Sequence, residues 1–60
     1  MFPKRKIFAG RVYSLAVDNL SKDYAIVYAK EYRQMGLMSR IYGLFFQYGG
    51  KWAVYIREKE

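Results

Sequence analysis

Basic and aromatic residues recur at every second position in two segments near the C-terminal end of the sequence. Residues 37–48 and 51–58 contribute one such set, which consists of Arg40, Tyr42, Phe46, Lys51, Tyr55 and Arg57. Aromatic rings stack on nucleic-acid bases at about 1 to 3 kcal/mol per base, and cations neutralise phosphates. If one face of a sheet carries these six side chains, they are candidates for binding nucleic acid, either DNA or RNA.

Few residues of this chain could support catalysis or bind a metal ion. The chain contains no cysteine and no histidine, so the usual zinc sites and Cys/His or Ser/His/Asp arrangements cannot be built from it. The carboxylates away from the C-terminal tail are Asp18, Asp23 and Glu31, which are expected on a loop or an exposed helix. We therefore expect a binding protein and not an enzyme, with no cofactor, metal or small-molecule substrate.

The charge of the chain also favours a polyanionic partner. Eleven Lys and Arg against five Asp and Glu give a formal net charge of +6. Residues 32–57 contain four basic residues and no acidic one. No apolar run approaches the length of a membrane span, and residues 1–6 lack the features of a secretion signal, so a cytoplasmic protein without a membrane partner is expected.

The N-terminal half predicts strand followed by helix. Residues 6–17 are rich in β-branched and aromatic residues and form either one strand or a short hairpin around Ala9 and Gly10. Ser21 suits an N-cap, and Gly36 suits the left-handed position after a helix, so a helix is expected from Lys22 to Met35. The apolar stripe of this helix is Ala25, Tyr28, Ala29, Tyr32 and Met35.

Residues 37–48 and 51–58 predict two strands joined at Gly49 and Gly50. A two-residue turn there pairs Tyr48 with Lys51, Phe46 with Ala53, Leu44 with Tyr55 and Tyr42 with Arg57. The opposite face is almost entirely apolar and is assigned to the core beneath the helix, where Gly43 would leave room for a helix side chain. It consists of Ile41, Gly43, Phe45, Trp52, Val54 and Ile56.

The expected fold is α+β, a βαββ unit with a three-stranded antiparallel-type sheet and one helix on one face. A right-handed crossover places the last strand between the other two. Residues 1–60 form a single domain, in which residues 1–5 are a flexible basic arm. Because 60-residue chains are marginally stable, we expect the nucleic-acid-binding protein to be a homodimer. The alternative is a homodimeric protein-interaction module in which the aromatic sheet face is buried.

The run SKDYAIVYAKEYRQMGLMSRIYG, followed by GGKWAVYIR, resembles SPOR-like repeats and small archaeal βαββ proteins. The resemblance covers roughly residues 13–57 and lies in Ser-Lys, spaced alanines, Arg-x-x-Gly and a closing Gly-Lys-Trp. It implies a split βαβ fold, which SPOR domains use in two copies to make a complete sheet, so a single copy again points to pairing. The glycan-strand binding of SPOR domains is not carried over, and no site residues are transferred.

Overall fold

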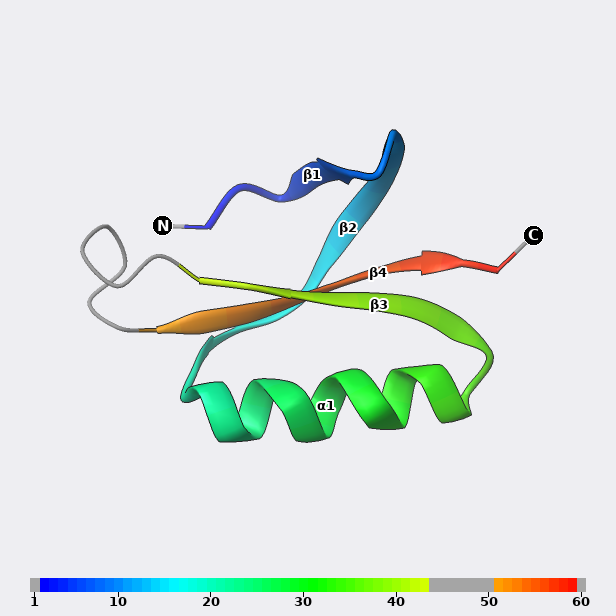
Figure 1. The fold of residues 1–60 in the computed structure, drawn as a ribbon. Helices are drawn as coiled ribbons and strands as arrows, with labels where there is room; N and C mark the ends of the chain where they lie inside the picture. Colours follow the sequence, from blue (N-terminus) through cyan, green and yellow to red (C-terminus); the bar gives the residue numbers. More distant parts are fainter. Residues whose placement is uncertain (1, 44–50, 60) are drawn as a thin grey trace.

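The computed structural model describes residues 2–43 and 51–59 of the chain. Its elements are β1 (Arg5–Phe8), β2 (Arg11–Leu20), α1 (Lys22–Gln34), β3 (Leu37–Tyr42) and β4 (Trp52–Glu58). The strands form one antiparallel sheet in the order β1-β2-β4-β3, and α1 packs on one of its faces (Figure 1). The α+β class and the central place of the last strand are confirmed. The expectation of three strands is wrong, because the sheet has a fourth.

The fourth strand arises because the segment around residues 6–17 folds back on itself. Ala9 and Gly10 both have positive φ, 51° and 76°, as a two-residue type I′ turn requires. This turn pairs Lys6 with Tyr13 and Phe8 with Arg11. Of the two alternatives for this segment, the hairpin is therefore the one that forms.

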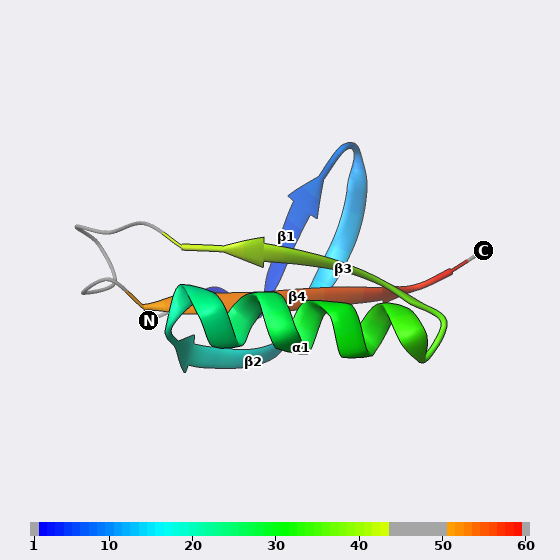
Figure 2. The ribbon, with the colours of Figure 1, turned by 60° about the horizontal axis from the view of Figure 1, so that its bottom comes forward.

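The second strand is long and irregular. Its pairing with β4 shifts register between Leu15 and Val17 and again between Val17 and Leu20, and Asn19 has a φ of 59°. Such bulges bend a strand and increase its twist. The β1–β2 hairpin consequently turns away from the direction of β3 and β4 (Figure 2). Leu15 packs on the face opposite α1, whereas Val17 packs on the face beneath α1.

The helix begins and ends where its local signals place it. The Ser21 hydroxyl accepts a hydrogen bond from the Tyr24 amide at 3.3 Å, and Gly36 follows the C-cap with a φ of 90°. Ala25 and Ala29 are buried, which lets α1 approach the sheet so closely that the Ser39 hydroxyl donates to the Ala29 carbonyl at 2.8 Å.

Two members of the predicted helix stripe lie outside the core. Tyr28 is 36% exposed and Met35 is 69% exposed. The buried alanines are the centre of the face that packs on the sheet, and Tyr32 is half-buried beside them. Tyr28 and Met35 lie on one flank of this narrow face, so the close approach of α1 leaves Tyr28 partly exposed and Met35 largely in solvent.

The register of β3 against β4 differs from the predicted one by four residues. Tyr42 is opposite Ala53 and Arg40 is opposite Tyr55, so the predicted pair of Tyr42 with Arg57 is wrong. A shift of four keeps every side chain on its expected face, because the period of a strand is two. The two-glycine turn at residues 49–50, on which the predicted register rested, lies outside the described residues.

A close contact between Gly43 and Trp52 fits the observed register. A Cβ atom added to Gly43 would lie 2.5 Å from Cδ2 of the indole ring, a distance that no side chain can occupy. The space at Gly43 therefore accommodates Trp52 of the neighbouring strand. The sequence-based expectation that a helix side chain fills this space is wrong.

The sheet separates two hydrophobic clusters. The cluster beneath α1 confirms Ile41, Trp52, Val54 and Ile56 as core residues, while Phe45 lies outside the described residues; its other members are Val17, Leu20, Ala25, Ala29 and Tyr32. The second cluster lies between the β1–β2 hairpin and the face opposite α1; it contains Phe2, Phe8, Tyr13, Leu15, Met38, Tyr42, Ala53 and Tyr55. The helix thus covers one face of the sheet, and the β1–β2 end of the same sheet folds over the other face.

The N-terminal residues close the second cluster. Phe2 is 5% exposed, and the Pro3 carbonyl accepts a hydrogen bond of 2.6 Å from the Tyr55 hydroxyl. The Lys4 carbonyl accepts from the Leu15 amide at 2.8 Å. An apolar side chain and two carbonyl groups thus attach residues 2–5 to the sheet, in the segment for which the sequence predicted a flexible arm.

Candidate nucleic-acid interface

The part of the predicted aromatic face around Tyr55 is buried inside the folded chain. Tyr55 is fully buried and Tyr13 is 2% exposed. Phe8 lies between them, with its ring centroid 5.3 Å from that of Tyr13 and 5.7 Å from that of Tyr55. The Phe8–Tyr13 pair is edge-to-face and the Phe8–Tyr55 pair is tilted, and such aromatic packing stabilises a core. A nucleic-acid base cannot reach the ring of Tyr55 unless the hairpin and the N-terminal residues first move away.

Tyr42 lies at the border of this aromatic cluster. It is half-buried, and its ring contacts Phe2, Phe8 and Tyr55 at centroid distances of 6.2 to 6.3 Å. The Lys6 ammonium lies 4.2 Å from the Tyr42 ring centroid, within the range of a cation–π contact. The hairpin thus places Lys6 over the ring of Tyr42, which the sequence analysis predicts to stack on a nucleic-acid base.

Two arginines of the predicted set converge on Tyr13. The Arg57 guanidinium carbon lies 5.6 Å from the Tyr13 ring centroid. A side-chain hydrogen bond from Arg40 lowers the pKa of the Tyr13 hydroxyl, with a further contribution from Arg57, and together they outweigh the opposing effect of burial. Arg40, Arg57 and Tyr13 come from three strands, β3, β4 and β2. The fold therefore assembles a basic group that no single segment contains.

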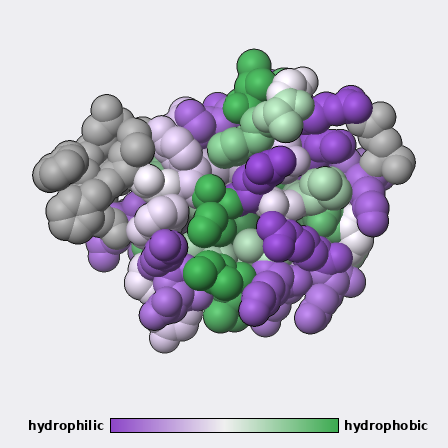
Figure 3. All heavy atoms as spheres, in the orientation of Figure 1, coloured by the Kyte–Doolittle hydropathy of each residue, from purple (hydrophilic) through white to green (hydrophobic). Residues whose placement is uncertain are grey.

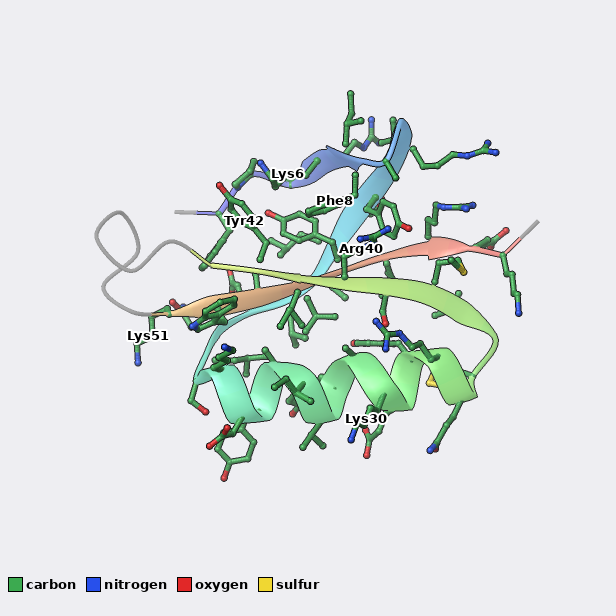
Figure 4. All side chains as sticks on the ribbon, viewed as in Figure 1. Lys6, Phe8, Lys30, Arg40, Tyr42 and Lys51 are labelled. Atoms are coloured by element: carbon green, nitrogen blue, oxygen red, sulfur yellow. The ribbon has the colours of Figure 1, made fainter. Side chains whose placement is uncertain are left out.

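The six residues predicted to bind nucleic acid do not all lie close together. Figure 4 shows Lys6, Phe8, Arg40 and Tyr42 together on the hairpin side of the sheet, whereas Lys51 lies apart where the chain enters β4. Lys51 is exposed, and Phe46 lies outside the described residues. Of the six predicted residues, Arg40, Tyr42 and Arg57 thus lie near one another on this side, with Tyr55 buried beneath them.

The sequence interpretation missed the contribution of the hairpin. The sequence places Lys6 and Tyr13 in the strand-forming segment 6–17 but predicts no binding role for either residue. The signal that could have identified them is the pairing across a turn at Ala9 and Gly10, which places Lys6 beside Tyr13 on one face of the hairpin. This inference needed the hairpin to be chosen over the single strand.

Charges are unevenly distributed between the two sides of the protein. The hairpin layer carries Lys4, Arg5, Lys6 and Arg11, and residues 2–17 contain no acidic residue. Arg40 and Arg57 belong to the same side of the sheet. The described carboxylates lie at the end of β2, on α1 and at the end of β4; they are Asp18, Asp23, Glu31 and Glu58. The β1–β2 hairpin and the adjoining Arg40 and Arg57 are therefore rich in positive charge.

An open hollow of about 420 Å³ extends the basic surface along β3. Its lining includes Arg33, Arg40 and Lys59 together with Leu37, Met38 and Ser39. One Arg33 nitrogen donates to the Ser39 carbonyl at 3.2 Å, so this cation also covers a backbone acceptor on the edge strand. Cations at a sheet edge oppose pairing with a like-charged second copy.

The described residues offer little else for chemistry. Within residues 2–43 and 51–59, no three His, Cys, Asp or Glu side chains are grouped so as to hold a metal ion. None of the helices in these ranges has the length and apolar character needed to cross a membrane.

Comparisons of the chain with protein-family models, with curated proteins and with solved structures gave no match. The resemblance to SPOR-like repeats and archaeal βαββ proteins stays a prediction. The interface rests on geometry and charge.

Proposed function

We propose that this protein binds nucleic acid through the phosphate backbone, using the cations on the side of the sheet opposite α1. The observation that carries the proposal is that four strands and the N-terminal segment contribute six basic side chains to the hairpin and the neighbouring part of the sheet; they are Lys4, Arg5, Lys6, Arg11, Arg40 and Arg57. Contacts between Lys or Arg and phosphates release counterions and supply most of the sequence-independent affinity.

The aromatic residues have a supporting role in this proposal. Lys6 lies over Tyr42, and Arg40 and Arg57 lie beside Tyr13. Long basic side chains that are held in place lose less conformational entropy when they bind. The rings therefore position cations for phosphates and do not themselves stack on bases, which is the change that the structure brings to the sequence-based hypothesis.

A salt titration tests the proposal. Fluorescence anisotropy of a labelled oligonucleotide would be measured between about 0.05 and 0.3 M NaCl, and the logarithm of the association constant plotted against that of the salt concentration. We expect a slope of about −3 to −5, as for a similar number of phosphate contacts. A slope near zero, or no binding at the lowest salt concentration, would refute the proposal.

Self-association is a second candidate, and exposed side chains on α1 favour it. Tyr24 is 65% exposed and Val27 is 51% exposed, and Ile26 and Tyr28 are each 36% exposed. Figure 3 shows apolar side chains gathered over the middle of α1. The homodimer expected from the sequence used the sheet face, which the hairpin of the same chain covers. A dimer through α1 would leave the basic side open.

Light scattering at high salt distinguishes this candidate. A dimer through α1 gives twice the 7.2 kDa mass of the chain, and Val27→Glu returns the mass to that of a monomer. A monomer at all salt and protein concentrations removes the candidate.

The proposal for this protein also includes a cytoplasmic location, as the sequence led us to expect. It further includes a non-enzymatic role, without cofactor or small-molecule substrate.

A further inference from the structure

The outward face of the β1–β2 hairpin is exposed and apolar at its centre. Ile7 and Val12 are opposite each other in the register, and they are 69% and 56% exposed. Arg5 and Ser14, the next pair on this face, are also exposed. An open hollow of about 740 Å³ lies here and is lined by Pro3, Arg5, Lys6, Ile7 and Val12. Two branched aliphatic side chains are thus held in solvent among cations.

The shape of this hairpin restricts the polyanion that it fits. Figure 2 shows it standing away from β3 and β4 as a two-stranded ribbon that ends in a tight turn. Paired strands are about 5 Å apart, and the major groove of B-form DNA, about 12 Å wide, admits such a ribbon. The major groove of an RNA duplex is too deep and narrow for side chains to read.

The side chains on the outward face also argue against a single strand as the target. Single-stranded nucleic acid is held by rings on which its bases stack. The hairpin has two such rings, Phe8 and Tyr13, and both pack into the inner cluster. Ile7 and Val12 offer the other kind of contact, since aliphatic groups pack against the C5-methyl group of thymine in the major groove.

We propose that the β1–β2 hairpin enters the major groove of duplex DNA with its outward face toward the base edges. In this arrangement Ile7 and Val12 contact thymine methyl groups, and Arg5 donates to acceptors on guanine. Lys4, which precedes β1, and Arg11, in the last pair before the turn, contact phosphates on either side of the groove. The inference rests on the proposed function, which it narrows from nucleic acid to duplex DNA.

A comparison of three ligands of one sequence tests this inference. Anisotropy would be measured at one salt concentration with a DNA duplex, its separate strands and the corresponding RNA duplex. We expect the DNA duplex to bind at least about tenfold more tightly than the other two. Equal affinity for all three overturns the hairpin inference and leaves the phosphate-binding proposal standing, whereas binding to none of them at low salt overturns both.

Replacing thymine by deoxyuridine tests the role of the apolar pair, because the replacement removes only the methyl group. We expect several-fold weaker binding of the uracil-containing duplex by the natural protein. The double variant Ile7→Ser, Val12→Ser should bind the two duplexes equally, and its thermal unfolding should be close to that of the natural protein because both residues are exposed. No effect of the methyl group on the natural protein would overturn the inference.

Discussion

The Tyr55 hydroxyl donates a hydrogen bond of 2.6 Å to the carbonyl oxygen of Pro3, which is 52 residues away in the sequence. Tyr55 is on the central strand β4, and Pro3 is in the N-terminal segment that closes the aromatic cluster. This contact joins the two ends of the chain across the face opposite α1. The N-terminal residues are therefore part of the folded structure, with consequences for stability.

Truncation of Phe2 should destabilise the protein strongly. The side chain is 5% exposed and contacts the ring of Tyr42. Replacing a buried Phe by Ala typically costs about 3 to 5 kcal/mol, a large part of the stability of so small a domain. We expect Phe2→Ala to lower the free energy of unfolding by about 3 kcal/mol in urea denaturation.

Ile7→Ala is the matched control for Phe2→Ala. Ile7 is also an apolar residue near the N-terminus, but 69% of it is exposed, so its truncation should change the free energy of unfolding by about 0.5 kcal/mol or less. Equal effects of the two variants would show that Phe2 does not belong to a closed cluster.

A methyl group at Gly43 should clash with Trp52. The added Cβ would lie 2.5 Å from the indole ring, and overpacking of this kind costs about 1 to 3 kcal/mol. A double-mutant cycle with Trp52→Leu, measured by thermal unfolding, should recover most of that cost. Gly36→Ala is the control, because the strain there comes from a φ of 90° with no neighbouring atom near, and Trp52→Leu should not relieve it.

Additive effects of Gly43→Ala and Trp52→Leu would contradict this explanation of the strand register. The register itself can be checked by backbone contacts in an NMR spectrum, which should place Tyr42 opposite Ala53 and not opposite Arg57.

Tyr13 should ionise earlier than an ordinary tyrosine. Arg40 and Arg57 stabilise its phenolate, so its pKa lies below the usual value of 10.0. In an ultraviolet titration of the seven tyrosines, one should show this early phase, and Tyr13→Phe should remove it. An unchanged titration curve in the variant would mean that the two arginines do not act on this hydroxyl.

The same shift has a consequence for stability. Because the pKa of Tyr13 is lower in the folded state than in the unfolded chain, ionisation of this group favours folding as the pH rises from the lowered pKa toward 10. The difference in unfolding free energy between the natural protein and Tyr13→Phe should therefore grow over that alkaline window. A difference that is flat or falls with pH would contradict the assigned direction of the shift.

Local signals predicted the helix, and strand periodicity predicted the faces of β3 and β4. Ser21 and Gly36 act within a few residues of the helix ends, so their effect can be recognised in the sequence. The period of two placed Val54 beneath α1 and Arg40 on the other side, and the four-residue error in register left both assignments intact because four is an even number.

The closed aromatic cluster could not be predicted from the sequence. It depends on a turn in which Ala9, a residue with no preference for positive φ, adopts a φ of 51°, and on the return of Phe2 to the sheet. The contacts of Lys6 with Tyr42 and of Tyr55 with Pro3 join residues that are 36 and 52 positions apart. No local sequence pattern indicates such contacts. The strand alternation therefore predicted an exposed face around Tyr55, which is part of the core in the structure.

The most direct test of the proposed interface is a pair of charge reversals that change the net charge equally. Arg40→Glu acts on the basic side of the sheet, whereas Lys30→Glu acts on α1, where Lys30 is exposed (Figure 4). Binding of a labelled DNA duplex at fixed salt should weaken at least about tenfold for Arg40→Glu and no more than about twofold for Lys30→Glu. Equal losses would mean that net charge alone attracts the DNA, and would contradict an interface opposite the helix.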